Sequence, residues 1–227
     1  MHEEALTNQG RALFPQLVRF SNFYLAGGTA LALQIGHRRS IDFDLFTAQE
    51  LPDRLLPTIK TIFSGSNITV TYSAPEQLNV LVDETRVTLL FYEYPLIEPL
   101  ISIHGVSVAT VNEIAAMKAF AIGKRISYKD YVDWYFMLSE KHVILSDIIK
   151  LAKQKYSNDF NDRLFLGQLA SIGDVQEVPI EYLRGAFDHH TIQNYLEKEV
   201  SDYKIWIPSA RFQLPQRGDI HRTNSNI

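Results

Sequence analysis

The feature that most constrains the fold of this chain is the segment from Tyr24 to Phe46, YLAGGTALALQIGHRRSIDFDLF. Its pattern predicts a buried strand at residues 24–26, a glycine turn, a short apolar helix at residues 29–35 and a second strand at residues 41–46. Successive side chains of a strand point to opposite faces, so Asp42 and Asp44 would share one face. The alternating apolar residues would enter the core: Ile41, Phe43 and Leu45.

Two carboxylates on one face form a site of hard oxygen ligands. Such a site suits Mg²⁺, which takes one or two protein carboxylates and leaves its other positions to water and substrate phosphates. The preceding glycine pair lets the backbone approach a ligand closely, and the N–H groups that open the next helix favour a phosphate. Either piece alone is most often structural, but their order and the thirteen residues between Gly28 and Asp42 favour a metal and nucleotide site.

The composition of the whole chain narrows the class of protein. It has 227 residues, a net charge of −4 and no cysteine. The negative charge argues against a surface that is basic throughout, so contact with nucleic acid would depend on a local patch. The lack of cysteine excludes disulfides and cysteine-ligated metals, and it fits a reducing cytoplasm. The polar N-terminus does not predict a signal peptide, and the best apolar run is interrupted by Lys118, so we expect no membrane span.

Periodicity divides the chain into two parts. Residues 3–20 predict an amphipathic lead-in helix, and residues 51–63 predict a helix on the sheet. Three further strands are predicted, at residues 68–72, 78–82 and 86–92. Beyond residue 110 the period becomes helical, so we expect an α+β protein. The expected units are an α/β domain at 1–110, a helical domain at 111–207 and a mobile tail at 208–227.

A second group of charged residues lies in the predicted helices. Lys118 is on a strongly apolar helix face, and Arg125 follows two turns later on the same side. An inward-facing cation needs a partner, and the next helix offers Asp130 and Asp133 on one face. Two interpretations stay open: a buried ion-pair network that clamps two helices, or cations that hold the phosphates of a nucleotide or an acceptor. The basic end of the short helix, residues 37–39, could likewise contact a phosphate or simply suit a helix C-terminus.

The order of strand, glycine turn, helix and Asp-x-Asp strand resembles the local signature of the polymerase-β-like nucleotidyltransferase superfamily. Together with the segment HGVSVATVNEIAAMKAFAIGKRISYKDYVDWYFML, it is similar to the AbiEii/AbiGii-type toxin family of nucleotidyltransferases. The similarity covers most of residues 20–140. It implies a polymerase-β-like mixed sheet domain followed by a helical C-terminal domain, with the active cleft between them.

The resemblance also implies an activity and partners. Such proteins are similar to the toxic halves of bacterial toxin–antitoxin and abortive-infection pairs, which implies a cognate antitoxin protein. The implied reaction is Mg²⁺-dependent transfer of a nucleoside monophosphate from an NTP to a hydroxyl, in some relatives on tRNA. Matched by position, the implied catalytic residues are Asp42, Asp44, Lys118 and Asp130, of which the first two would hold the metal. The predicted nucleotide contacts are Gly27, Gly28 and Thr29 from the glycine motif, with Arg39 and Arg125 from the charge pattern.

One departure from the superfamily pattern affects the expected chemistry. Many relatives carry a third carboxylate on a later strand, but the corresponding run RVTLLFYEYP has no aspartate. Thr88 or Leu90 takes the expected position, and Glu93 near the strand end is a partial substitute. Asp130 could act as the base instead, since a carboxylate from another element can serve if it reaches the nucleophile. An active enzyme, a weak enzyme and a nucleotide- or protein-binding relative without chemistry all stay open, as does an antibiotic-type nucleotidyltransferase of small molecules.

Overall fold

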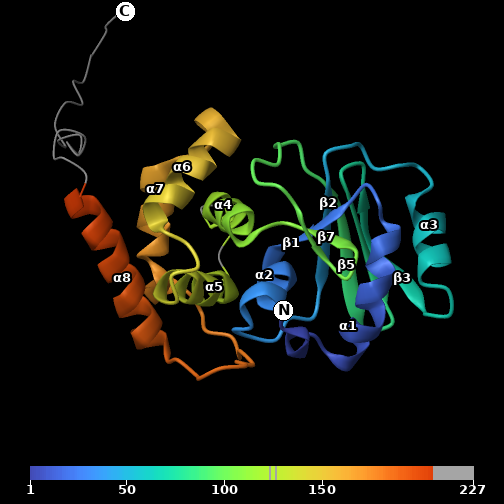
Figure 1. Cartoon of the computed structure of the whole chain (residues 1–227), viewed down its shortest axis with the longest axis horizontal. Coiled ribbons are helices and arrows are strands. Elements are labelled where there is room, and N and C mark those ends of the chain that lie inside the picture. Colours follow the sequence, from blue (N-terminus) through green and yellow to red (C-terminus); the bar gives the residue numbers. More distant parts are fainter. Residues whose placement is uncertain (123, 126, 207–227) are drawn as a thin grey trace, which may run out of the picture.

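The computed structural model describes residues 1–122, 124–125 and 127–206. The predicted mobile tail at 208–227 therefore lies outside the described residues. A sheet with flanking helices forms one half of the molecule, and a group of helices forms the other (Figure 1). In the described ranges no helix is long and apolar enough to cross a membrane.

The sheet has seven strands in the order β3-β4-β5-β2-β1-β7-β6. Their bounds are β1 (Tyr24–Ala26), β2 (Phe43–Thr47), β3 (Ile68–Ala74), β4 (Gln77–Val82), β5 (Thr85–Phe91), β6 (Ile101–Ile103) and β7 (Val106–Val108). The sheet is mixed, because β2 runs parallel to β5 and β1 runs parallel to β7, while the other neighbours are antiparallel. The expected mixed α+β architecture is confirmed.

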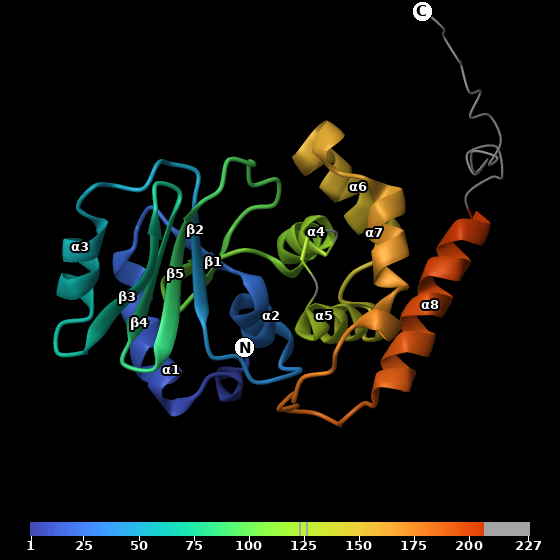
Figure 2. The ribbon, with the colours of Figure 1, turned by 180° about the vertical axis from the view of Figure 1, so that it is seen from behind.

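The helices lie around this sheet in layers. They are α1 (Asn8–Leu13), α2 (Gly27–Ile35), α3 (Leu55–Ile62), α4 (Val111–Ala121), α5 (Tyr128–Ser139), α6 (Leu145–Tyr156), α7 (Asp162–Leu169) and α8 (His189–Trp206). Both views place α2 between the sheet and the pair α4 and α5, with α3 on the other side of the sheet (Figure 2). Helix α2 is therefore an inner helix that contacts both halves of the molecule.

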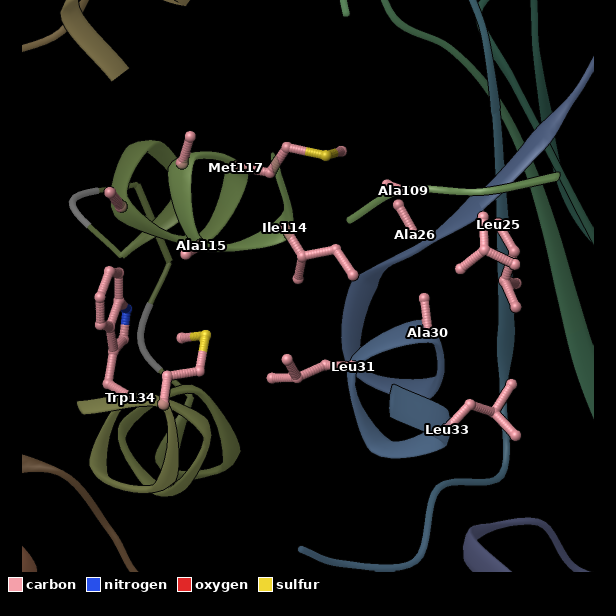
Figure 3. Close-up of a cluster of buried hydrophobic side chains, with 14 of the residues drawn as sticks. Leu25, Ala26, Ala30, Leu31, Leu33, Ala109, Ile114, Ala115, Met117 and Trp134 are labelled. Atoms are coloured by element: carbon pink, nitrogen blue, oxygen red, sulfur yellow. The ribbon is translucent and has the colours of Figure 1, made fainter. Parts of the chain in front are cut away.

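The position of α2 explains why its sequence is apolar all round. Ala30 and Leu33 point toward the strands, and Leu31 points toward Ile114 of α4 (Figure 3). All four side chains are completely buried. A helix that is apolar on every side is expected in the middle of a core rather than at its surface. The sheet and the helical half consequently share one hydrophobic core, which runs through α2.

Several sequence-based boundaries differ from the structure. The predicted lead-in helix at 3–20 is divided into a 3₁₀ turn at Glu3–Ala5, helix α1 and a second 3₁₀ segment at Phe14–Arg19. The break follows from tertiary contacts: Leu6 forms a β-bridge with Ser40, and the Thr7 side chain caps α1. The short hairpin of β6 and β7 was not predicted. Its strands are three residues each, too short for an alternating pattern to identify.

The boundaries around the carboxylate motif also need correction. Helix α2 begins at Gly27 rather than at residue 29, so both glycines belong to its first turn. Strand β2 begins at Phe43 rather than at residue 41. Ile41 is 50% exposed instead of entering the core. Because the chain is not yet paired with a neighbouring strand at this point, the alternation expected of a strand does not extend back to Ile41.

Candidate active site

A cavity of about 990 Å³ lies between the two halves of the molecule. The first turn of α2 and the segment 38–44 form one wall, and the start of β5 adds to it. Lys118 of α4 and the first turn of α5 form the opposite wall, and residues 175–181 close a third side. Eight of the nine predicted site residues line this cavity, all except Gly27: Gly28, Thr29, Arg39, Asp42, Asp44, Lys118, Arg125 and Asp130.

The two predicted metal carboxylates face this cavity at the N-terminal end of β2. Asp44 pairs with Ala26 of β1 on one side and with Thr88 of β5 on the other. Asp42 lies just before the strand, with 36% of its side chain exposed, and it accepts a hydrogen bond from Arg86. Burial raises the pKa of Asp44, and the negative charge of Asp42 adds to this effect, while Arg86 opposes it.

The donor set of this pair fits a hard divalent cation. Both groups supply carboxylate oxygens, and both line an open cavity in which water or substrate oxygens could complete the coordination. Across the described ranges, no group of three or more His, Cys, Asp or Glu side chains is arranged to hold a metal. A cation at this place would therefore depend on ligands from outside the protein as well as on Asp42 and Asp44.

The glycine pair is required by close contacts with charged side chains. Gly27 has a positive φ of 73°, and a Cβ added there would lie 2.8 Å from Oδ2 of Asp44. A Cβ on Gly28 would lie 2.6 Å from Nη2 of Arg38. The backbone that opens α2 is thus packed between a candidate metal carboxylate and a guanidinium group. A side chain at either position would displace one of them.

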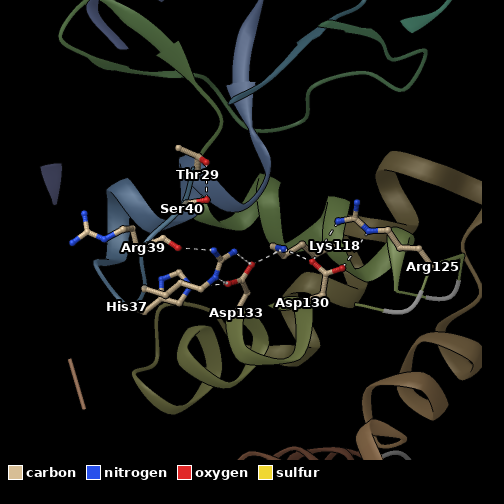
Figure 4. A network of polar contacts seen from close by, with 9 residues as sticks. Thr29, His37, Arg39, Ser40, Lys118, Arg125, Asp130 and Asp133 are labelled. Atoms are coloured by element: carbon tan, nitrogen blue, oxygen red, sulfur yellow. Dashed lines mark hydrogen bonds and ion pairs between the residues drawn. The ribbon is translucent and has the colours of Figure 1, made fainter. Parts of the chain in front are cut away.

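The hydroxyl of Thr29 has an internal role. It lies 2.7 Å from the Ser40 hydroxyl and also contacts the backbone carbonyl of Asp42, and the residue is buried (Figure 4). These contacts tie the first turn of α2 to the segment that precedes β2. Thr29 therefore fixes the distance between the glycine turn and the carboxylates, although it also lines the cavity.

Lys118 and Arg125 meet the carboxylates that the sequence offered as partners. Nζ of Lys118 lies 2.6 Å from Asp130 and 2.7 Å from Asp133 (Figure 4). Arg125 donates to Asp130 at 3.2 Å, and 63% of its side chain is exposed. Burial on its own would lower the pKa of Lys118, but the charges of Asp133 and Asp130 outweigh it and raise that pKa. Lys118 is therefore a permanent cation at the edge of the cavity.

Asp133 is the centre of a network that the sequence showed only in part. Its carboxylate accepts hydrogen bonds from Nε of Arg38 at 2.7 Å and Nη2 of Arg38 at 3.1 Å, and it also lies 2.7 Å from Nε2 of His37. Burial alone would raise the pKa of Asp133, but the charges of Arg38 and Lys118 outweigh it and hold the pKa well below its usual range. Burial lowers the pKa of His37, so this ring is neutral and donates from Nε2. The basic end of α2 and the two aspartates of α5 were visible in the sequence, but their pairing depends on the packing of α2 against α5.

The cavity has a wall that the sequence did not predict. Residues 175–181 lie between α7 and α8, and the backbone carbonyl of Glu181 accepts a hydrogen bond from the Arg39 backbone N–H at 2.8 Å. The Arg39 guanidinium donates to the Glu181 carboxylate at 2.6 Å and to the Leu6 carbonyl at 3.0 Å. Arg39 therefore anchors this wall in the structure described here, at the rim of the cavity where a nucleotide contact was predicted.

The charge balance of the cavity favours anions. Its cationic lining residues are Arg38, Arg39, Arg86, Lys118, Arg125 and Lys129. Its acidic lining residues are fewer: Asp42, Asp44, Asp130 and Glu181. A cavity with an excess of cations beside two metal-type carboxylates suits a ligand that carries phosphates and a divalent cation together.

Known proteins share this sequence and fold. Residues 11–77 match the family model described as "Nucleotidyl transferase AbiEii toxin, Type IV TA system". The uncharacterized protein aq_aa25 of Aquifex aeolicus is 33% identical over 186 residues, which is 81% of this chain and 88% of that protein. Among solved structures, MenT4, a nucleotidyltransferase toxin of Mycobacterium tuberculosis, has a TM-score of 0.57 at 15% identity, over 84% of this chain and 80% of that chain. JHP933 of Helicobacter pylori has a TM-score of 0.53 at 18% identity, over 88% of this chain and 92% of that chain.

These findings agree with the geometry of the site. The family model spans the glycine turn and both candidate metal carboxylates. The solved structures share the fold over 84% and 88% of this chain, well beyond the residues that the family model matches. The chain belongs to the same family as aq_aa25, and its residues 11–77 carry the AbiEii nucleotidyltransferase toxin domain.

Proposed function

We propose that this protein transfers a nucleoside monophosphate from an NTP to a hydroxyl group of an RNA acceptor such as tRNA, in a reaction that needs Mg²⁺. The observation that carries the proposal is the pair of carboxylates, Asp42 and Asp44, beside the first turn of α2. The opposite wall of the same cavity carries the cations Lys118 and Arg125. The acceptor oxygen would form a bond to the α-phosphorus while the bond to the leaving pyrophosphate breaks. The hydroxyl proton would pass to solvent.

Asp42 and Asp44 would hold the divalent cation. When bound, that cation would neutralise the triphosphate and polarise its oxygens, as divalent cations do in phosphoryl transfer. The carboxylate pair supplies part of its coordination, and the triphosphate and water would supply the rest. Thr29 would hold the backbone of Asp42 in place through its contact with that residue's carbonyl, and the close approach of Gly27 leaves the Asp44 side chain little room to move.

The remaining charged residues of the cavity would bind and orient the phosphates. The free N–H groups in the first turn of α2 favour an anion, and Lys118 and Arg125 lie across the cavity from them. Both oxygens of Asp130 already accept hydrogen bonds from Lys118 and Arg125. We therefore assign Asp130 the role of holding these two cations toward the substrate, rather than that of a base.

The family description as a type IV toxin–antitoxin system supports two further parts of the proposal. The biological role would be that of the toxin, and a cognate antitoxin protein would counteract it. Asp44 pairs with Thr88, one of the two positions at which the superfamily resemblance led us to expect a third carboxylate. The hydroxyl at this place favours a second candidate: a protein that binds nucleotides without transferring them.

A binding and transfer experiment tests the main proposal. Asp42→Asn and Asp44→Asn should each abolish Mn²⁺-dependent binding of an NTP while leaving the melting temperature unchanged or higher, because the mutual repulsion of the carboxylates is relieved. Asp53→Asn, at an exposed aspartate outside the cavity, is the matched control. Unchanged NTP affinity in both site variants would refute the proposal. Retained binding by the wild type, with no transfer of a labelled nucleotide to total RNA, would favour the second candidate.

A further inference from the structure

Strand β5 presents a cation to the carboxylate pair at the place where a third acidic residue could have stood. It runs parallel to β2, with Phe43 opposite Val87 and Asp44 opposite Thr88. Arg86 precedes Val87, so its side chain leaves β5 on the same face as Thr88 and lies beside Asp42. The two positions of β5 that face the carboxylates thus carry a hydroxyl and a guanidinium.

The contact between Arg86 and Asp42 is direct. Nη2 of Arg86 donates to Oδ2 of Asp42. Arg86 lines the cavity, and 51% of its side chain is exposed. The charge of Arg86 also reaches Asp44, where it opposes the effect of burial on that carboxylate. The positive charge of Arg86 therefore offsets part of the negative charge of both candidate metal ligands.

This arrangement limits how many divalent cations the site can hold. Two cations side by side need enough carboxylate oxygens to bridge and balance them. Here only two carboxylates face this part of the cavity among the described residues, and Arg86 already occupies an oxygen of one of them. A second divalent cation beside Asp42 would lie against the positive charge of Arg86 and would lack an acidic ligand from β5.

We propose that this site takes a single divalent cation on Asp42 and Asp44, and that the Arg86 guanidinium supplies the second positive charge. The inference rests on the proposed function, since it specifies how the same carboxylates are used. In the absence of nucleotide Arg86 competes with the metal for Asp42. With a nucleotide bound, its exposed side chain reaches the reacting phosphate or the acceptor oxygen.

The two proposed effects of Arg86 can be separated by removing its charge. Competition with the metal predicts a higher Mn²⁺ affinity, whereas assistance of the reaction predicts a lower transfer rate. Arg86→Gln removes the competing charge, so Mn²⁺ should bind the nucleotide-free protein more tightly. We expect a gain of roughly fivefold in affinity, which corresponds to about 1 kcal/mol, the upper end for an exposed ion pair. The same variant should transfer nucleotide at least about tenfold more slowly, because a charge that stabilises the transition state is lost. A residue that only supported the fold would not tighten metal binding.

The experiment counts bound Mn²⁺ on the full chain by electron paramagnetic resonance, with and without a non-hydrolysable NTP analogue. We expect one ion per chain in the wild type and one more tightly bound ion in Arg86→Gln. Arg86→Asp, which adds a carboxylate beside Asp42, should bind a second ion. Arg86→Lys keeps the charge and should retain one ion at nearly wild-type affinity, and it serves as the folded reference. Arg54→Gln, at an exposed arginine outside the cavity, is the matched control and should behave as wild type.

The outcomes separate this inference from the proposed function. Two ions per chain in the wild type, or Mn²⁺ binding to Arg86→Gln that is unchanged or weaker, would overturn the role of Arg86 and leave the nucleotidyltransferase proposal standing. Failure of the wild type to bind any Mn²⁺ in the presence of the analogue would overturn both.

Discussion

Asp133 carries a negative charge in the interior, and three side chains from other parts of the chain converge on it. His37 and Arg38 follow α2, and Lys118 belongs to α4, whereas Asp133 itself belongs to α5. A buried charge is tolerated only when it is paired and hydrogen-bonded, and here each of the two cations has a carboxylate partner. The network therefore fixes Lys118 and Arg38 at the cavity. It also joins α4 and α5 to the segment that follows α2.

Removing the carboxylate of Asp133 should destabilise the protein strongly. Asp133→Asn leaves Arg38 without its buried partner, and we expect a loss of roughly 3 to 5 kcal/mol in the free energy of unfolding. Urea unfolding of this variant beside Asp53→Asn measures the effect. A loss below about 1 kcal/mol, the usual worth of an exposed pair, would contradict the buried-network interpretation.

The wild type and Asp133→Asn together test how the stability depends on pH. The folded-state pKa of Asp133 is lowered from the ordinary value of 3.8, so its ion pairs stabilise the fold fully above that value. The contribution is lost as the pH falls through the lowered folded-state pKa. The stability difference between wild type and Asp133→Asn should therefore stay constant from neutral pH down to the ordinary aspartate range and shrink below it. A difference that already shrinks at mildly acidic pH would show that another group is responsible.

The glycine turn offers a second prediction at the residue scale. In Gly28→Ala the new Cβ would collide with Nη2 of Arg38, and Arg38 cannot move freely because it is paired with Asp133. In Gly27→Ala the Cβ would press on the Asp44 carboxylate, and the positive φ adds strain. We expect both variants to lose stability and Gly27→Ala also to bind Mn²⁺ more weakly. Gly167→Ala on α7 is the control, because its Cβ would meet nothing within 4 Å, and it should be neutral or slightly stabilising.

At the scale of elements, the sequence predicted those parts whose signal is local. Strand β1 has the predicted bounds, and helices α4 to α8 follow from their helical period. The two carboxylates were predicted from a spacing of two residues within one strand. The pairing of Arg38 with Asp133 and the wall at 175–181 join segments far apart in the chain. No local pattern encodes such contacts, so the sequence indicated the charged residues of the site but not which of them would meet.

A second buried ion pair joins α4 to α6 away from the cavity. Glu113 and Lys155 are completely buried, and Glu113 also accepts a hydrogen bond from the backbone N–H of Glu98 at 3.0 Å. Glu113→Gln should lower the free energy of unfolding by roughly 3 to 5 kcal/mol, since the Lys155 ammonium would remain buried without a counter-charge. Mn²⁺ and NTP affinity per folded molecule should stay unchanged, because this pair does not line the cavity. Weaker nucleotide binding in the folded variant would show that α4 depends on α6 to position Lys118.

At the scale of the whole molecule, the active-site cavity depends on both halves. The predicted division into units at 1–110 and 111–207 remains a prediction. The structure shows that α2 contacts β1 and β2 on one side and α4 and α5 on the other. The buried network around Asp133 crosses the same boundary. A cavity whose two walls share a core and a charge network cannot open widely without disrupting that core.

The shared core predicts that the protein unfolds in one cooperative step despite its two-part architecture. Differential scanning calorimetry should show a single transition, with equal calorimetric and van't Hoff enthalpies. Binding of an NTP with Mg²⁺ at 100 times its Kd should stabilise the folded state by about 2.7 kcal/mol and raise that one transition as a whole. Hydrogen exchange should then slow in the first turn of α2 and in the first turn of α5 together, because each forms a wall of the occupied cavity. Two separate calorimetric transitions, of which only the first responds to nucleotide, would mean that the halves are independent units and that the helical half does not contribute to the binding site.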